Sequence, residues 1–260
     1  MNLRSFRTLF YVIYFLIVTT PKRSDLRELA KTDPEESARI SHQYVKRALR
    51  HLLRIAGVKV EVSGLENIPE EPCLYVGNHS SYYDIIVAES VIPGGTGFVA
   101  KDSLKKIPLL ASWMNLIHCL FLDRDNAREG LKTILLGADY LKEGFSMFIF
   151  PEGTRSRDGQ IAPFKGGSMK MAQKADAPVV PVAISGSAEI FEKNEGLRVT
   201  PGTVKISFGS PFRISELSRE DKKRAGELAR NSIQNMLVRP TASLASGFAG
   251  DGSVENVSTS

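Results

Sequence analysis

Residues 73–90 read CLYVGNHSSYYDIIVAES, in which a short apolar run is followed by a polar segment and then by a helical pattern. The apolar run predicts a buried strand at Cys73–Val76, and the later residues predict a helix at Tyr82–Val91. His79 therefore lies directly after a strand. In α/β folds this end of a strand is where reactive groups gather.

The same alternation of apolar runs and helical patterns continues along the chain. It predicts helices at Asn126–Glu143, Ser168–Ala175 and Ser215–Val238. Six more strands are predicted, at Val58–Val62, Gly97–Ala100, Cys119–Leu122, Met147–Phe150, Val179–Ser185 and Val204–Phe208. This order favours an α/β fold, with a single domain over residues 57–238 and a mostly parallel mixed sheet of about seven strands flanked by helices.

The composition agrees with one folded domain. The chain has 260 residues, of which 42% are hydrophobic and 24% are charged, enough to bury one sizeable core. Its two cysteines, Cys73 and Cys119, lie in apolar stretches and lack the spacing of a zinc site or a CxxC motif. We therefore expect no disulfide scaffold and no metal site.

The positive charge of the chain is concentrated near its start. The formal net charge is +5, and residues 1–56 hold eleven Lys and Arg against five Asp and Glu. This excess favours an anionic partner, such as acidic lipid headgroups, a phosphorylated substrate, an acidic carrier protein or nucleic acid. Nucleic acid is the least favoured of these, because the basic residues adjoin an apolar run and lack interleaved aromatic side chains.

That apolar run is Leu9–Val18, with basic residues before and after it. It is too short to span a bilayer, which takes about 20 residues. The run is typical of a segment embedded in one leaflet, of a core helix or of a signal peptide. Lys22 and Arg23 stand where a signal peptide has its small-residue cleavage site, which disfavours secretion.

A second N-terminal helix is predicted at Glu35–Ala56, where five basic side chains share one arc and apolar side chains fill most of the rest. Such a helix either lies on an anionic membrane surface or packs in a core with its charged face in solvent. Together with the apolar run, it favours a membrane-associating two-helix segment over residues 1–56. Residues 239–260, rich in Ser, Gly, Ala and Val, are predicted to be disordered.

His79 and Asp84 have the spacing of a general base and the carboxylate that orients it. The pattern His-x4-Asp also occurs by chance in many proteins, and by itself it fits a structural histidine better. A second segment at a predicted strand end, FPEGTRS at residues 150–156, changes this balance. It places a carboxylate, a glycine, a hydroxyl and a guanidinium in one turn, a set that suits an anion. Arg124, in FLDR at residues 121–124, offers a second guanidinium.

Taken together, these segments resemble the glycerolipid acyltransferase family, in particular the 1-acyl-sn-glycerol-3-phosphate acyltransferases, also called lysophosphatidic acid acyltransferases. The four blocks of that family correspond in order to residues 78–84, 121–124, 150–156 and 180–184, the last of which reads VPVAI. The second block departs from the family pattern at His118-Cys119-Leu120, which affects strand packing and leaves Arg124 in place.

The resemblance implies transfer of a fatty acyl group to the sn-2 hydroxyl of 1-acyl-glycerol-3-phosphate, giving phosphatidic acid, with no covalent acyl-enzyme. His79 would be the base and Asp84 its orienting partner. The family places the acceptor phosphate near arginines that here are Arg124 and Arg155, and Glu152, Gly153 and Thr154 are further substrate-binding positions. Lys101 matches a basic position that is expected to bind the phosphate or the acyl carrier. The resemblance implies no cofactor beyond the acyl-CoA or acyl-carrier-protein co-substrate, a lysophosphatidic acid acceptor in membrane lipid, and a place on the cytoplasmic face of the inner or plasma membrane.

Other functions remain open on the sequence. The same chemistry could act on another lysolipid or on glycerol-3-phosphate. A lipase or thioesterase is disfavoured, because the chain lacks a Gly-x-Ser-x-Gly nucleophile motif. A membrane-binding module without enzymatic activity would explain the basic N-terminal segment. It would not explain why the reactive residues stand at strand ends.

Overall fold

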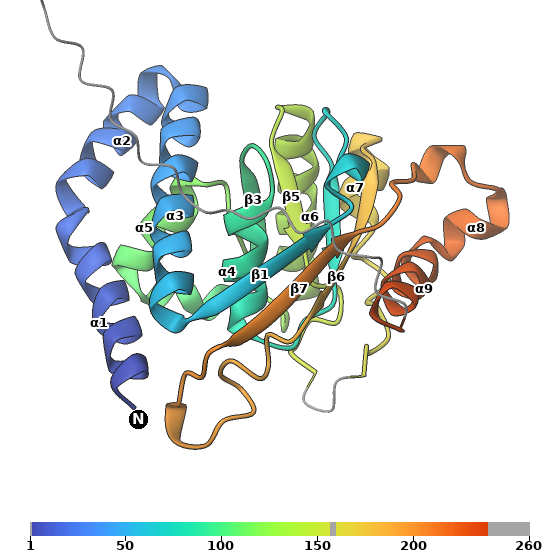
Figure 1. The fold of residues 1–260 in the computed structure, drawn as a ribbon. Helices are drawn as coiled ribbons and strands as arrows, with labels where there is room; N and C mark the ends of the chain where they lie inside the picture. The colour runs from blue at the N-terminus through green and yellow to red at the C-terminus, as the bar shows by residue number, and fades with distance from the viewer. Residues whose placement is uncertain (1, 157–159, 239–260) are drawn as a thin grey trace, which may run out of the picture.

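The computed structural model of the protein describes residues 2–156 and 160–238, so the tail predicted at 239–260 lies outside the described residues. One seven-stranded sheet forms the centre of the molecule (Figure 1), with the strand order β1-β7-β6-β2-β5-β3-β4. The strands are β1 (Val58–Ser63), β2 (Leu74–Gly77), β3 (Thr96–Lys101), β4 (Leu120–Leu122), β5 (Ser146–Ile149), β6 (Val179–Ser185) and β7 (Gly202–Phe208).

The sheet is mostly parallel, which confirms the predicted fold class. The strands β6, β2, β5, β3 and β4 run in one direction, and only the pairing of β6 with β7 is antiparallel. All four residues of β2 and six of the seven in β6 are buried, as expected for parallel strands covered on both faces. The carboxyl ends of five strands therefore meet at one edge of the sheet.

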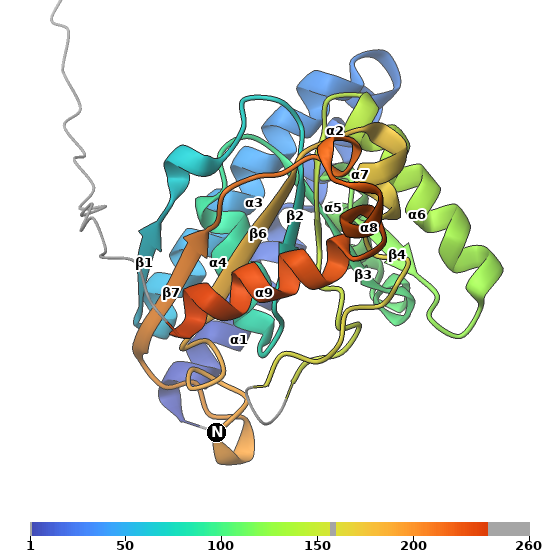
Figure 2. The ribbon, with the colours of Figure 1, turned by 90° about the vertical axis from the view of Figure 1, so that its right-hand side faces the viewer.

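Helices cover both faces of this sheet (Figure 2), with α3 (Pro34–Ala56) behind it and α9 (Ala225–Val238) in front. The side chain of Tyr75 on β2 packs in the core shared with α3, α4 (Tyr82–Val91) and α5 (Pro108–Leu116). Its neighbours Leu74 and Val76 face the opposite core, with α6 (Ala127–Lys142), α7 (Lys170–Ala175) and α9. The period-2 alternation of a strand thus divides the apolar residues between two layers.

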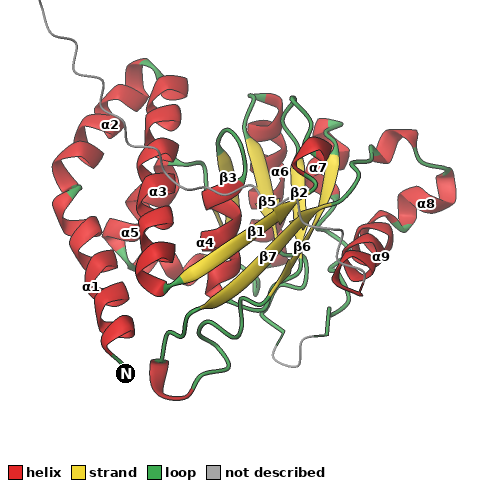
Figure 3. Cartoon of the chain, in the orientation of Figure 1, coloured by secondary structure: helices red, strands yellow, loops and turns green. Residues whose placement is uncertain are grey.

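Three helices precede the sheet, rather than the two that were expected (Figure 3). They are α1 (Leu3–Val18), α2 (Thr20–Thr32) and α3. The sequence of α2 shows no broad apolar stripe, but Pro21 favours its first turn and Leu26 packs into the core. The helix expected at Ser215–Val238 is also divided, because a 3-10 turn at Ile214–Glu216 precedes α8 (Arg219–Lys223) and α9.

The interpretation of α3 as a helix lying on a bilayer is wrong. Its apolar side chains are buried against the sheet, which is the alternative that the same periodicity allowed. Part of its basic arc binds the end of α4: Lys46 donates to the carbonyls of Ile92 and Gly94, and Arg50 donates to that of Ser90 at 2.9 Å. These cations satisfy carbonyls that the end of a helix leaves unpaired.

A buried contact between His42 of α3 and Glu89 of α4 adds to this clamp, with 2.9 Å between Nδ1 and Oε1. The first turn of α4 holds Asp84. The N-terminal helices therefore hold in place the element that supplies the predicted relay carboxylate.

The exposed apolar surface of the N-terminal helices lies on α1. Eight of its large apolar side chains are exposed, including Leu3 at 73%, Phe6 at 55% and Phe10 at 60%. The opposite side of α1 packs on the core through Phe15 and Leu16. Among the described helices, none has by itself the length and hydropathy needed to cross a bilayer; α1 and α2 meet that criterion only as a pair bent by 52°.

Candidate active site

His79 and Asp84 form a hydrogen-bonded pair after β2. Nδ1 of His79 lies 2.9 Å from Oδ2 of Asp84, whose side chain is fully buried, while 13% of the His79 side chain is exposed. Local sequence creates this geometry, because Ser81 is the N-cap of α4 and Asp84 accepts from the Ser81 backbone N–H in a capping box. The capping box thus fixes the position of the carboxylate independently of the imidazole.

Three further donors reach the carboxylate of Asp84. The backbone N–H groups of Ser80 and Ser81 donate to Oδ2, at 2.6 Å and 2.8 Å. The hydroxyl of Ser187, in the loop after β6, donates to Oδ1. Ser187 is fully buried, and its hydroxyl also lies 3.0 Å from that of Ser80. Asp84 therefore acts as an acceptor on both oxygens, which leaves His79 Nδ1 as a donor.

Neighbouring strands support the imidazole and the loop that carries it. The ring of His79 stacks on Phe150, with 4.1 Å between centroids and 21° between planes. Asn78 bonds to both backbone groups of Ile184 on β6, with each distance 2.8 Å. The first and fourth sequence blocks therefore meet directly, although about a hundred residues separate them.

Glu152 lies beneath this loop and is 5% exposed. Its Oε1 accepts the backbone N–H of His79 at 2.7 Å, and its Oε2 accepts that of Ala162 at 2.9 Å. Burial raises the pKa of the Glu152 carboxyl, and the two backbone hydrogen bonds oppose that rise. Both oxygens thus hold backbone groups, including the backbone of His79 itself. Ser156 adds a second link, donating its N–H to the His79 carbonyl at 2.8 Å.

The turn after β5 brings further candidates to the same edge. Gly153 has φ +72°, a conformation that favours glycine, and its carbonyl accepts a hydrogen bond from Arg124. Thr154 is exposed in this turn. A side chain at position 153 would also meet Lys165, whose Nζ would lie 2.8 Å from a Cβ placed there. Lys165 is thus a further cation beside the turn.

Arg155 is already paired with a carboxylate. Its Nη1 lies 2.8 Å from Oε1 of Glu192, and its guanidinium stacks over the ring of Tyr82, 3.8 Å from the centroid. Nη2 donates to the Tyr82 hydroxyl at 3.2 Å. Oε1 of Glu192 also accepts the backbone N–H of Tyr82, at 2.9 Å, whereas Oε2 is buried and has no partner among the described residues.

Lys101 stands at the carboxyl end of β3 and is exposed, and its side chain forms no hydrogen bond or ion pair within residues 2–156 and 160–238. The strand β3 pairs with both β4 and β5, so Lys101 shares an edge with Arg124 and the turn at 151–156. The predicted residues therefore collect at one edge. Direct contacts join His79 with Asp84 and Glu152, and Arg124 with Gly153, whereas Arg155 contacts Glu192 and Tyr82. In the same described residues, no cluster of three or more His, Cys, Asp or Glu is arranged to hold a metal ion.

Comparison with known proteins relates the chain that forms this edge to a protein family. A family model described as Acyltransferase matches residues 59–185, from the second residue of β1 to the end of β6. This segment of the chain is similar to that acyltransferase family. The chain is 30% identical over 195 residues to a 1-acyl-sn-glycerol-3-phosphate acyltransferase of Saccharomyces cerevisiae, a match that covers 74% of this chain and 64% of the yeast protein.

Two bacterial members of the acyltransferase family extend the comparison. A 1-acyl-sn-glycerol-3-phosphate acyltransferase of Borreliella burgdorferi is 29% identical over 204 residues, covering 76% of this chain and 80% of that protein. The crystal structure of the 1-acyl-sn-glycerophosphate (LPA) acyltransferase PlsC from Thermotoga maritima superposes with a TM-score of 0.70 at 26% identity, covering 92% of this chain and all of that one. The chain spans less than two thirds of the length of the yeast relative.

Two residues of this site were missed by the sequence reasoning. Ser187 and Glu192 both lie in the loop after β6, and they contact Asp84 and Arg155 respectively. The signal for Ser187 was its place two residues beyond a predicted strand that ends at Ser185, the same kind of position that drew attention to His79. Glu192 stands farther along the loop, and nothing in its local sequence marks it.

Proposed function

We propose that this protein is a 1-acylglycerol-3-phosphate O-acyltransferase. It transfers a fatty acyl group from acyl-CoA or an acyl carrier protein to the sn-2 hydroxyl of 1-acyl-glycerol-3-phosphate, giving phosphatidic acid for phospholipid synthesis. The observation that carries the proposal is the His79–Asp84 pair, with 2.9 Å between Nδ1 and Oδ2, at the sheet edge that also holds Arg124 and Arg155. The names of the yeast and Borreliella relatives agree with it.

In the first step His79 acts as the general base. Because Nδ1 donates to Asp84, Nε2 has the free lone pair and takes the proton of the acceptor hydroxyl. The oxygen attacks the thioester carbonyl carbon, and a C–O bond forms. Asp84 stabilises the imidazolium that results, and such a base contributes about 10²- to 10⁴-fold in rate.

In the second step the tetrahedral intermediate collapses and the C–S bond breaks. The imidazolium returns its proton to the leaving thiolate, so His79 ends the cycle neutral and the released carrier is a thiol. No covalent bond to the protein is formed. Burial raises the pKa of Cys73 to about 11 and that of Cys119 to about 12, which makes neither a suitable alternative nucleophile.

The acceptor phosphate binds beside this pair, through the cations of the edge. Arg155, Arg124 and Lys101 supply the positive charge, and Thr154 adds a hydroxyl donor from the turn. Glu192 competes with the phosphate for Arg155, so the acceptor has to share or displace that carboxylate. Glu152 contributes by holding the loop of His79, and Gly153 by accepting a hydrogen bond from Arg124.

The enzyme works at a membrane, with the exposed apolar face of α1 in the lipid. Phe6, Phe10 and Tyr14 stack along that face, with centroids 6.2 Å and 6.4 Å apart. An amphipathic helix of this kind lies in the interface plane of a bilayer. We place it at the cytoplasmic face of the inner or plasma membrane, where acyl thioesters and lysophosphatidic acid meet.

The test is a donor-by-acceptor assay with the full chain on mixed vesicles. Acyl-CoA and acyl carrier protein are each offered with 1-acyl-glycerol-3-phosphate, glycerol-3-phosphate or a lysophospholipid with a larger headgroup, and both free thiol and acylated product are measured. We expect phosphatidic acid to form fastest from 1-acyl-glycerol-3-phosphate, and His79→Ala to abolish it. Equal activity of His79→Ala, or free fatty acid released without any acceptor, would refute the mechanism.

A further inference from the structure

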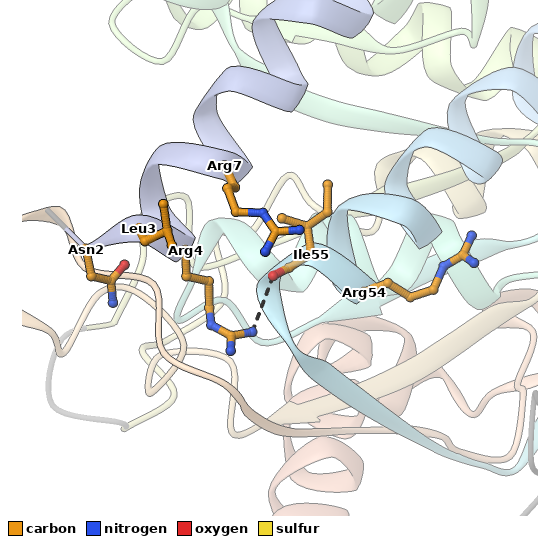
Figure 4. A pocket seen from close by; sticks show the side chains of 6 residues that line it. All are labelled: Asn2, Leu3, Arg4, Arg7, Arg54 and Ile55. Carbon is orange, nitrogen blue, oxygen red and sulfur yellow. Dashed lines mark hydrogen bonds between the residues drawn. The ribbon is translucent and has the colours of Figure 1, made fainter.

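A small cavity separates the start of α1 from the end of α3, away from the His79 edge (Figure 4). It has a volume of about 430 Å³ and is lined by Asn2, Leu3, Arg4, Arg7, Arg54 and Ile55. Three of these six residues are arginines, and none of the six is acidic. Because the arginines come from two helices about fifty residues apart in sequence, only the packing of α1 on α3 brings them together.

The three arginines differ in how far they are already engaged. Nη1 of Arg4 donates to the Ile55 carbonyl at 3.3 Å, so Arg4 offsets the partial negative charge at the end of α3. Figure 4 shows that the guanidinium groups of Arg4 and Arg7 turn toward Ile55, whereas Arg54 extends along the other side of α3. The side chains of Arg7 and Arg54 form no hydrogen bond or ion pair with another described residue.

Three other arginines of the surface have acidic partners: Arg39 pairs with Glu36, Arg224 with Glu227, and Arg213 with Glu71. Arg7 and Arg54 line one cavity, and no acidic side chain lines it with them. An uncompensated group of guanidinium ions in a concave site is suited to a phosphate, which it can bind through two N–H groups at a time.

The surroundings of the cavity indicate which kind of phosphate it binds. Leu3 lines it and belongs to the exposed apolar face of α1, and Arg7 is one helical turn from both Leu3 and Phe10. A soluble phosphate ion has no apolar part that could contact that face. In a phospholipid, the headgroup phosphate and the acyl chains are parts of one molecule. The phosphate can bind the arginines while the acyl chains contact the apolar face of α1.

We propose that this arginine cavity binds the headgroup phosphate of an anionic phospholipid in the bilayer, separately from the acceptor at His79. The inference rests on the proposed contact of α1 with lipid and not on acyl transfer.

The position of the cavity gives such binding a consequence for the active site. Asn2 donates from its side chain to the Val199 carbonyl at 3.0 Å, and the Ser5 hydroxyl accepts the Val199 N–H at 2.8 Å. Val199 belongs to the segment after β6 that also carries Ser187 and Glu192. In Figure 1 this segment and the start of α1 lie together at the lower end of the molecule. A lipid held at the cavity would therefore keep the catalytic edge close to the membrane surface.

The test measures flotation of the full chain with two kinds of vesicle, neutral phosphatidylcholine and phosphatidylcholine containing phosphatidylglycerol. We expect Arg7→Gln/Arg54→Gln to lose affinity for the anionic vesicles by about tenfold or more and to keep its affinity for neutral ones. The matched control, Arg47→Gln/Lys174→Gln, removes two exposed positive charges outside the cavity and should lose less than threefold, roughly the effect of net charge alone. All proteins, including the otherwise wild-type chain, carry His79→Ala, so turnover does not alter the lipid, and matched melting curves establish that they are folded.

Each outcome bears on the inference. Equal losses in the arginine variant and in its control, or no loss in either, would overturn it. Release of the wild-type chain by inorganic phosphate at constant ionic strength would show a free-phosphate site and overturn the assignment to lipid. If the wild-type chain binds neither kind of vesicle, the membrane contact of α1 fails as well, whereas the acyl-transfer proposal is judged only by the assay of turnover.

Discussion

The hydroxyl of Ser187 donates to Oδ1 of Asp84, while Nδ1 of His79 donates to Oδ2 of the same carboxylate. Two loops that follow neighbouring strands, β6 and β2, therefore meet at one buried acid. Ser187 touches no reacting atom in this arrangement. It positions the carboxylate and shares its negative charge, so the strength with which Asp84 holds the imidazolium depends on it.

We expect Ser187→Ala to lower kcat on the order of tenfold, the equivalent of one hydrogen bond to a charged group. Without that hydrogen bond Asp84 stabilises the imidazolium more strongly, so the acid limb of the profile of kcat/KM against pH should move to higher pH. Ser187→Thr, which keeps the hydroxyl, should restore the wild-type profile. A profile unchanged in Ser187→Ala would contradict this role even if kcat falls.

A second prediction concerns the Glu192 carboxylate, which forms an ion pair with Arg155. Glu192→Gln keeps an oxygen for the Tyr82 N–H and removes the negative charge that, in the proposed function, competes with the acceptor phosphate. The KM for 1-acyl-glycerol-3-phosphate should fall severalfold with kcat little changed, whereas Arg155→Gln should raise that KM. Steady-state kinetics at a fixed donor concentration measure both KM and kcat. A higher KM in Glu192→Gln would contradict the prediction and would mean that the ion pair organises the phosphate site.

A third prediction follows from the two acceptor bonds of Glu152. Glu152→Gln replaces one acceptor by an NH₂ group that faces a backbone N–H, of either His79 or Ala162. We expect the free energy of unfolding to fall by about 1–3 kcal/mol and kcat to fall with it. Chemical denaturation and activity are measured on the same samples. Unchanged stability would show that the loop does not depend on this carboxylate.

The stability of the wild-type protein should also depend on pH through Glu152. Its folded-state pKa is raised above the ordinary 4.5, mainly by burial, so the folded protein holds this proton to higher pH than the unfolded chain does. The stabilisation that comes with this proton is fully present below 4.5 and is lost as pH rises through the raised pKa. Glu152→Gln should lack this component, so the difference between the two unfolding curves against pH isolates it.

The last prediction tests the apolar face of α1. Phe6→Ser/Phe10→Ser should weaken binding to neutral phosphatidylcholine vesicles by roughly 2–4 kcal/mol. The reason is that the two exposed aromatic side chains, which pass from water into lipid when the wild type binds, are removed. Leu131→Ser, on the exposed surface of α6, is the control and should bind as the wild type does. Equal binding by the double variant and the control would remove α1 as the membrane contact.

Particular residues show how far sequence reasoning reached. The strand and helix around His79 were predicted because both are local: an apolar run predicts the strand and a helical pattern predicts the helix. The three charged blocks were predicted at strand ends, and in a mostly parallel sheet those ends lie at one edge. In contrast, α2 and α5 were missed, since their stability comes from packing of a few side chains such as Leu26 and Trp113 onto the core.

By itself, the sequence determined the α/β alternation, the capped turn that joins His79 to Asp84, and the presence of arginines after two more strands. These follow from period, propensity and hydrogen bonds between residues close in the chain. Only the tertiary structure decided that α3 packs in the core while α1 keeps an exposed apolar face, because an amphipathic pattern does not say whether protein or lipid covers it. It also decided that Ser187 bonds to Asp84, that Glu192 pairs with Arg155 and that Arg7 and Arg54 line one cavity. Such contacts depend on where distant loops end, and that is fixed by the packing of the whole sheet.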